Sequence, residues 1–197
     1  MFNKIQEQFE KNKFYVYDDF LSKDECKELS DKFFYTLKNN KDRLQKEGPR
    51  SKQVKNSHEI YTPFPEIGVL CLDKIEKITG VRLGFTYCYS RLYKKGSDLK
   101  PHIDRSASEY SVTIPLAFSE QNDWPIKFRD VESNTYNECV QDIGNGIVYM
   151  GEKLWHWRPS LPIDWSLHLF LHYVDINGKH KDLENEYKKH KDLRSII

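Results

Sequence analysis

The most restrictive feature of this sequence is a series of short β-favouring segments that begins near residue 81. Each segment is rich in aromatic and β-branched residues, and polar turn residues separate it from the next. This spacing is typical of an antiparallel sandwich or barrel and predicts a mainly β domain. The predicted strands are Val81 to Tyr93, Tyr110 to Phe118, Trp124 to Arg129, Asn137 to Val140, Ile147 to Met150 and Trp165 to Val174.

Helical patterns flank this β-rich region on its N-terminal side. Residues 1–13 are polar and suit a short helix or an arm, and Phe14 to Phe20 suits a strand. Ser22 and Glu25 have the spacing of a capping box, which predicts a helix of about 17 residues after Ser22. Apolar residues recur at helical spacing in a second segment, and this predicted helix runs from Glu66 to Thr79 and stops at Gly80.

Length and composition favour one domain that spans residues 1–197, with a barrel core at 14–175. The segment 176–197 is heavily charged, and its thin apolar stripe predicts a peripheral C-terminal helix from Lys179 to Arg194. Residues 39–55 are polar and basic, which favours a solvated loop, although a lid or substrate-contact loop remains an alternative. The oligomeric state stays open.

The charge and the cysteine content limit which binding partners and which cellular location we expect for this protein. The formal net charge of +1 gives no argument for a polyanionic partner, so nucleic acid is not expected as a ligand. No segment of the sequence is typical of a signal peptide or of a membrane span. The four cysteines are scattered and form no Cys-x-x-Cys pair, which favours buried thiols and a cytoplasmic location.

Two histidines and one aspartate suggest a metal site in the β-rich region. His102 and Asp104 are two residues apart, so both can face the same side of an extended segment, and His156 follows about fifty residues later. Two imidazoles and one carboxylate can occupy one face of an octahedral Fe(II) and leave the opposite face for other ligands. The short His-x-Asp pattern is weak alone, but its position between predicted strands supports a site at a barrel mouth.

Several ordered motifs together resemble the Fe(II)- and 2-oxoglutarate-dependent oxygenases, in particular the branch of the prolyl 4-hydroxylases. They are Phe14 to Cys26, Arg91-Leu-Tyr93 with Gly96 ahead of His102-Ile-Asp104-Arg105, Gly144-Asn-Gly146, and His156-Trp-Arg158 leading into Phe170 to Val174. The resemblance covers residues 14–175. It implies a double-stranded β-helix, which is a barrel of the jelly-roll or cupin type, and Fe(II) bound by His102, Asp104 and His156.

The resemblance also implies a reaction. In this family 2-oxoglutarate is decarboxylated to succinate and CO2 by dioxygen while a second substrate is oxidised, and ascorbate is a candidate reductant. We therefore expect a hydroxylase of an unactivated C–H bond, with a prolyl or other peptide residue or a small molecule as substrate. The alternatives are an oxidative nucleic-acid demethylase with the same iron chemistry and a non-catalytic metal-binding barrel.

One position departs from the family pattern. Family members usually carry an Arg or Lys about ten residues after the second histidine, where it pairs with the far carboxylate of 2-oxoglutarate, and this chain has Ser166 there. A co-substrate other than 2-oxoglutarate therefore remains open. For the carboxylate we expect Tyr93 or His168, the latter as an imidazolium, ahead of Arg158, Arg105 and Arg91. Arg105 and Trp124 are candidates for substrate contacts.

Overall fold

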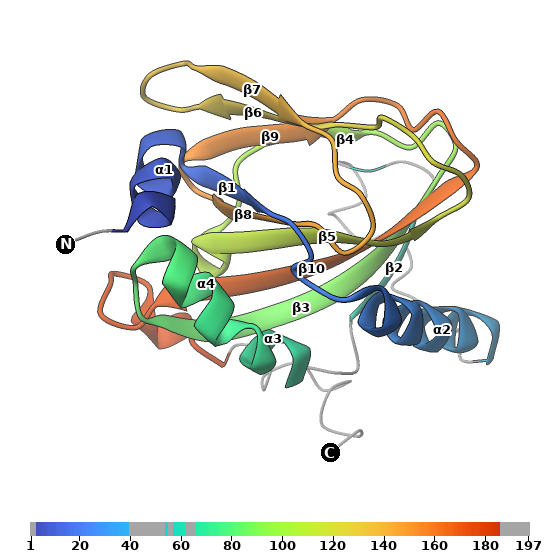
Figure 1. Cartoon of the computed structure of the whole chain (residues 1–197), viewed down its shortest axis with the longest axis horizontal. Coiled ribbons are helices and arrows are strands. Elements are labelled where there is room, and N and C mark those ends of the chain that lie inside the picture. Colours follow the sequence, from blue (N-terminus) through green and yellow to red (C-terminus); the bar gives the residue numbers. More distant parts are fainter. Residues whose placement is uncertain (1–2, 40–53, 55–56, 62–65, 186–197) are drawn as a thin grey trace.

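The chain folds into two antiparallel β-sheets that face each other, with helices against the larger one (Figure 1). The structure is a computed structural model that describes residues 3–39, 54, 57–61 and 66–185. The larger sheet has the strand order β1-β8-β5-β10-β3-β2, and the smaller sheet has the order β4-β9-β6-β7. The strands are β1 (Phe14–Tyr17), β2 (Ser57–Tyr61), β3 (Leu83–Lys94), β4 (Leu99–His102), β5 (Tyr110–Phe118), β6 (Ile126–Asp130), β7 (Tyr136–Cys139), β8 (Gly146–Met150), β9 (Leu154–Arg158) and β10 (Trp165–Asp175).

The helices cover the outer face of the larger sheet, opposite the smaller sheet (Figure 1). They are α1 (Lys4–Asn12), α2 (Lys23–Asn39), α3 (Glu66–Leu70) and α4 (Leu72–Thr79), with short 3₁₀ turns η3 (Ser106–Ser108) and η4 (Lys181–Leu183). The largest apolar cluster lies between these helices and the sheet, and two smaller ones lie between the sheets. The barrel interior is thus free to hold polar side chains, because most of the apolar area is buried elsewhere.

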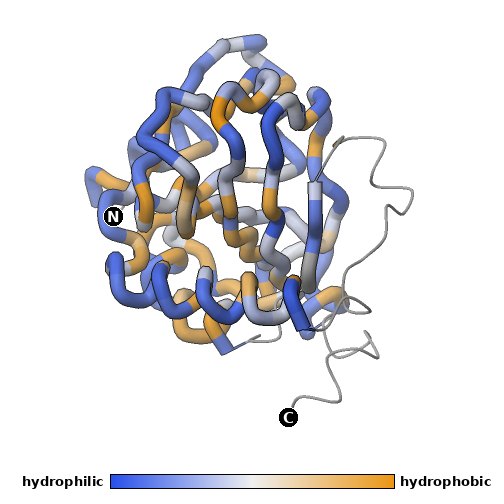
Figure 2. Tube along the Cα trace, turned by 90° about the vertical axis from the view of Figure 1, so that its right-hand side faces the viewer, coloured by the Kyte–Doolittle hydropathy of each residue, from blue (hydrophilic) through white to orange (hydrophobic). Residues whose placement is uncertain are grey.

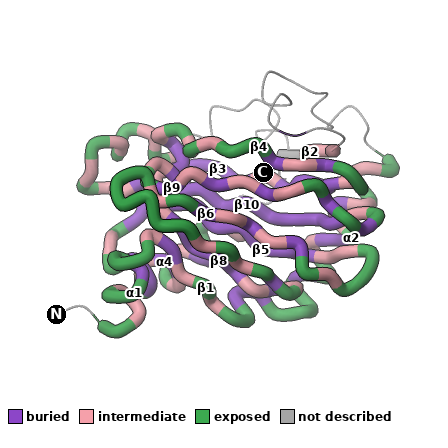
Figure 3. The backbone as a smooth tube through the Cα atoms, turned by 90° about the horizontal axis from the view of Figure 1, so that it is seen from above, coloured by how far each residue is buried: buried purple, intermediate pink, exposed green. Residues whose placement is uncertain are grey.

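Strand β10 shows how the sequence separates these two layers. Leu167, Leu169 and Leu171 alternate with polar or aromatic residues and pack into the helix-side cluster. Phe170 and His172 belong to the opposite face and line a cavity in the barrel. The central strands are buried along most of their length, and hydrophobic and hydrophilic residues alternate along them (Figures 2 and 3).

The predicted fold class and most of the predicted elements are confirmed. The capping box is present, since the Glu25 backbone N–H donates to Ser22 Oγ and the Ser22 backbone N–H donates to Glu25 Oε2. Gly80 ends the second predicted helix in the left-handed conformation, although this helix is interrupted at Cys71 between α3 and α4. Residues 1–13 contain a helix, α1, and not only an arm.

Three short strands, β2, β4 and β9, were not among the predicted strands. In the predicted C-terminal helix, the described part contains only the 3₁₀ turn η4, and residues 186–197 lie outside the described residues. Most of the proposed lid at 39–55 also lies outside them. Each helix in the described ranges is too short or too polar to cross a lipid bilayer.

Replacement of Gly144 tests how tightly the turn before β8 is packed. Gly144 has a φ of +88°, and a Cβ added there would lie 2.4 Å from the backbone oxygen of Leu21. Gly96 has a similar φ of +83° but no atom within 4 Å of such a Cβ. We expect Gly96→Ala to lower the free energy of unfolding by about 1–2 kcal/mol. Gly144→Ala should lower it by clearly more, because it adds a backbone clash.

Urea unfolding of both variants measures this difference. Equal losses for the two alanines would contradict the described packing of the turn against Leu21.

Candidate active site

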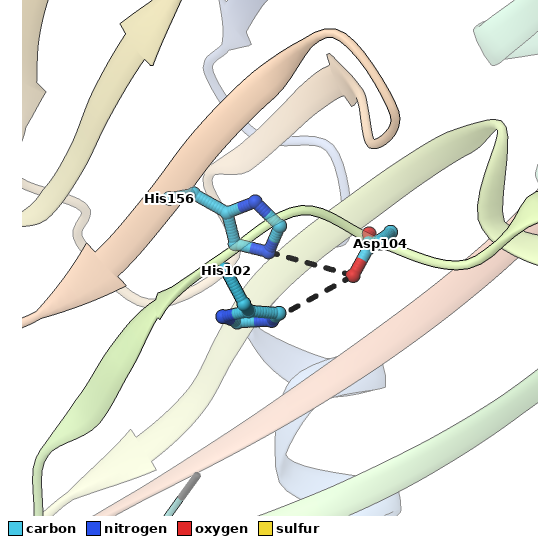
Figure 4. Close-up of side chains that lie close together, drawn as sticks. All are labelled: His102, Asp104 and His156. Atoms are coloured by element: carbon cyan, nitrogen blue, oxygen red, sulfur yellow. Dashed lines mark ion pairs between the residues drawn. The ribbon is translucent and has the colours of Figure 1, made fainter. Parts of the chain in front are cut away.

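Three side chains from two neighbouring segments converge at the smaller sheet (Figure 4). His102 is the last residue of β4, and its direct cross-strand partner in β9 is His156. Asp104 follows in the loop after β4, and its Oδ1 lies 3.8 Å from His102 Nε2 and 3.5 Å from His156 Nε2. The three ligand atoms lie within 4.8 Å of one another, so one ion placed between them can contact all three. The predicted metal ligands are therefore brought together.

Both imidazoles are oriented by the same local contact. The Nδ1 of His102 lies 2.8 Å from the backbone oxygen of Lys100, and the Nδ1 of His156 lies 3.1 Å from that of Leu154. A carbonyl oxygen only accepts, so each Nδ1 carries the proton and each Nε2 presents its lone pair towards Asp104. This is the tautomer that a metal ligand needs.

The charge states of the ligands also suit a divalent ion. Burial, together with the neighbouring charge of His156, lowers the pKa of His102 to about 4, so its ring is neutral at pH 7. Burial by itself would raise the pKa of Asp104, but the ring of His156, which carries a charge and donates a hydrogen bond to the carboxylate when it is protonated, lowers this pKa well below its usual range. With both Nε2 atoms deprotonated, as metal binding requires, the set offers two neutral nitrogens and one carboxylate, which is the facial set typical of non-haem Fe(II).

Asp104 is held so that one of its two oxygens faces the histidines. Its backbone N–H donates to the carbonyl of Gly151 at 2.9 Å, and its Oδ2 accepts from Ser111 Oγ at 2.8 Å. A Cβ on Gly151 would lie 2.6 Å from that Oδ2, so the carboxylate packs directly against this glycine. Because Oδ2 is enclosed, Asp104 is arranged to bind through Oδ1 alone, which keeps further coordination positions available.

Ser111 connects the aspartate to His172 of β10. The single hydroxyl proton of Ser111 goes to the carboxylate, so the Nδ1 of His172, 2.9 Å away, is the donor in the second hydrogen bond. The imidazole stacks on Tyr87 at 4.4 Å between ring centroids and lies parallel to Tyr89 at 5.6 Å. His172 is therefore a packed, hydrogen-bonded residue, and it fixes the direction of the Ser111 hydroxyl.

The triad opens into a cavity of about 260 Å³. Its wall on β3 and β10 is a series of nearly parallel rings, in which Tyr89 and Phe170 stack at 4.8 Å. Such a wall excludes water from the space next to the ion. Besides the triad, the cavity is lined by Glu59, Tyr87, Tyr89, Arg91, Leu99, Ile103, Arg105, Ser108, Ile126, Tyr149, Phe170 and His172.

Two of the predicted arginines reach this cavity. Arg91 is buried and forms an ion pair with Glu59, so its charge is already neutralised by a protein carboxylate. Arg105 is exposed, and its guanidinium lies 4.6 Å above the ring of Tyr87 at the side of the cavity. Contact of Arg105 with a substrate stays a prediction.

The other predicted residues lie deeper in the barrel and do not line the cavity. They are Tyr93, Arg158, Ser166, His168 and Trp124. Trp124, a predicted candidate for a substrate contact, is 5% exposed and donates from Nε1 to the carbonyl of Pro159 at 2.8 Å, so it packs inside the barrel. Ser111 was not identified from the sequence as part of the site.

Solved structures of known oxygenases share this fold. A prolyl-4-hydroxylase from Pseudomonas putida superposes with a TM-score of 0.61 at 13% identity, covering 85% of this chain and 96% of that one. A Trichoplax adhaerens prolyl hydroxylase in complex with a hypoxia-inducible-factor peptide gives 0.65 at 13% identity, with 85% and 87% covered. HygX from Streptomyces hygroscopicus, with nickel and 2-oxoglutarate bound, gives 0.64 at 13% identity, with 89% and 88% covered.

The sequence matches no protein-family model and no curated protein. The structural matches nevertheless agree with the observed sheets, and the chain has the double-stranded β-helix fold of the Fe(II)- and 2-oxoglutarate-dependent oxygenases. Its barrel carries the His-Asp-His triad that the resemblance implied.

Removal of the Ser111 hydroxyl should weaken metal binding without removing a ligand. In Ser111→Ala the Oδ2 of Asp104 loses its donor and the carboxylate is free to turn, so we expect the affinity for Co(II) to fall about 10–100-fold. Anaerobic titration that follows the Co(II) absorption spectrum measures this. Ser108→Ala is the matched control, because Ser108 is equally buried but its hydroxyl contacts Tyr87. Equal Co(II) affinities of the two variants would contradict the proposed hold on Asp104.

Acid should destabilise the metal-free protein through His102. The pKa of this ring is about 4 in the folded chain and about 6.5 when unfolded, so the unfolded state takes up a proton first as the pH falls. The free energy of unfolding therefore falls by up to about 3 kcal/mol as the pH is lowered from 6.5 to 4. Urea unfolding at pH 7 and 4.5 should show a smaller loss for His102→Gln than for the wild type. A loss of equal size would show that His102 is not held in its neutral form.

Proposed function

We propose that this protein is an Fe(II)- and 2-oxoglutarate-dependent oxygenase that hydroxylates an unactivated C–H bond. The observation that carries the proposal is a set of three protein ligands that opens into a cavity. Within the described residues, no fourth His, Cys, Asp or Glu joins the group. A structural metal site usually has four protein ligands, whereas a catalytic site keeps open positions.

The ligand set matches the needs of this chemistry. Two neutral imidazoles and one carboxylate would leave Fe(II) with one net positive charge and room for a bidentate keto acid and dioxygen. When bound, iron would supply the activation of dioxygen that couples decarboxylation of 2-oxoglutarate to oxidation of the substrate. The protein's own contribution is to hold Oδ1 of Asp104 and both Nε2 atoms towards one point and to exclude water with Tyr87, Tyr89 and Phe170.

The cavity supports a substrate that presents one small group to the site. A volume of about 260 Å³ is at the lower end of ligand pockets, so a keto acid and a single side chain or small ring would fill it. A similar fold holds a peptide in the Trichoplax prolyl hydroxylase. We therefore favour a peptide substrate, with prolyl residues first, and a small molecule as the other class. Ascorbate as a reductant remains a prediction.

Succinate formation tests the reaction type. The protein with Fe(II), 2-oxoglutarate and dioxygen should release succinate, even in the slow turnover without a substrate, and should release none when Fe(II) is omitted. His102→Ala should reduce this release to background because an iron ligand is lost. His58→Ala is the matched control, since His58 lies on β2 and contributes nothing to the triad or the cavity lining. Absence of succinate with the wild-type protein would refute the proposed function.

A mass shift identifies the substrate class. Peptide pools and methylated oligonucleotides incubated with the active protein separate a hydroxylase from a nucleic-acid demethylase. A gain of one oxygen atom from ¹⁸O₂ in a peptide supports the proposal, and loss of a methyl group from an oligonucleotide would favour the demethylase.

A further inference from the structure

Arg158 is a buried cation that has no acidic partner among the described residues. The residue is 2% exposed, and its Nη2 donates to the neutral side-chain oxygen of Gln141 at 2.8 Å. The amide of Gln141 is itself fixed by donating to the backbone oxygens of Thr113 and Asn145. An unpaired guanidinium in a protein interior is costly, because its desolvation is not offset by an anion. The other buried arginine, Arg91, has Glu59 as such a partner.

Three polar atoms near Arg158 contact no hydrogen-bond partner in the described part of the chain. They are Nε of Arg158 itself, Oη of Tyr93 and Nδ1 of His168. Trp124 brings the three side chains together, since its ring lies 4.8 Å from the Arg158 guanidinium, 5.1 Å from the Tyr93 ring and 5.7 Å from the His168 ring. Several buried polar atoms without partners in one place form an arrangement that a bound polar ligand or ordered water would satisfy.

All three atoms are suited to act as donors. Arg158 and Tyr93 each carry a hydrogen there, and Ser166 Oγ lies 2.9 Å from Nε2 of His168. If the Ser166 hydroxyl donates to that nitrogen, the neutral imidazole carries its proton on Nδ1. Burial, and then the charge of Arg158, lower the pKa of His168 well below its usual value, so the ring is neutral and not the imidazolium expected from the sequence. A cation with two further donors matches a carboxylate, which only accepts.

The position of this cluster relative to the metal ligands fits one particular carboxylate. His156 lines the cavity, and Arg158 lies two residues further along β9. On the facing strands, His168 is the cross-strand partner of the cavity-lining Arg91, and Tyr93 follows Arg91 by two residues. Alternate residues share a face, so the cluster is the next inward-facing layer, about 7 Å along the strands. A five-carbon dicarboxylate chelated at the metal through its keto-acid end is long enough to reach it.

We propose that Arg158, together with Tyr93 and His168, binds the distal carboxylate of the 2-oxoglutarate co-substrate. This inference rests on the proposed function and deepens it. The cation comes from the strand of the second histidine, and the strand that usually supplies it contributes Ser166 and His168. Ser166 then acts indirectly, because it fixes the tautomer of His168.

The assignment can be tested by comparing the affinities of the protein for two keto acids, without measuring turnover. The probes are 2-oxoglutarate and 2-oxopentanoate, which has the same chain length but a methyl group in place of the distal carboxylate. Calorimetric titration of the Co(II)-loaded protein should show tighter binding of 2-oxoglutarate by the wild type. In Arg158→Met the affinity for 2-oxoglutarate should fall about 30-fold or more, because a buried charge pair is lost, while the affinity for 2-oxopentanoate should change little.

Two further variants separate the assignment from its competitors. Arg158→Lys should retain part of the preference for 2-oxoglutarate, because it keeps the charge but loses the planar fork. The double variant Arg91→Met with Glu59→Gln removes the other buried arginine and its partner together, and it should keep the preference. Unchanged Co(II) affinity of Arg158→Met shows that the barrel is still folded, since Arg158 does not contact the triad.

The outcomes distinguish this inference from the proposed function. Arg158→Met could prefer 2-oxoglutarate over 2-oxopentanoate as strongly as the wild type does, or only the Arg91 and Glu59 double variant could lose this preference. Either result would overturn the role of Arg158 and leave the oxygenase proposal intact. A wild-type protein that binds Co(II) but neither keto acid would overturn both.

Discussion

The site depends on the antiparallel pairing of β4 with β9. This pairing places His102 directly opposite His156, with 4.2 Å between the ring centroids, and the chain then needs only two more residues to bring Asp104 to the same point. Each ring is held by the backbone carbonyl two residues before it, so the strands themselves set the direction of both nitrogens. Residues that are fifty positions apart thus form one ligand set without a long side-chain network.

The larger sheet supports this pair from the opposite side of the barrel. Its central strands carry apolar residues towards the helices and aromatic or polar residues towards the interior, because side chains alternate between the two faces. On the interior face, Tyr89 and Phe170 form a cross-strand pair of the aromatic wall, and the next pair is Arg91 with His168. Tyr93 and Arg158 lie two residues beyond Arg91 and His156, so the polar cluster adjoins the triad and the wall. Arg158 is buried without an acidic partner in the described part of the chain, and this has a physical explanation if the polar cluster receives an anion.

The predicted fold and triad agree with the structure because both depend on local patterns. Tyr110 to Phe118 alternates as a strand and is observed with the same limits, and the His-x-Asp and His motifs have a fixed spacing. Strands β4 and β9 are short and contain Pro101 or charged residues, so their pairing could not be predicted from propensity. The contact of Ser111 with Asp104 and the lack of an acidic partner of Arg158 among the described residues are tertiary properties that no spacing in the sequence reveals. The sequence also could not show that Trp124 packs inside the barrel, because an aromatic residue at the start of a predicted strand can face either way.

X-ray absorption at the iron edge of the Fe(II)-loaded protein tests the central claim most directly. Multiple scattering from the imidazole rings gives the number of histidine ligands. The distance and scattering strength of the first coordination shell distinguish oxygen and nitrogen ligands from sulfur. We expect two imidazoles and no sulfur, with the same two imidazoles retained after anaerobic addition of 2-oxoglutarate. A sulfur shell, or fewer than two imidazoles around the iron, would contradict the convergence of His102, Asp104 and His156 on one ion.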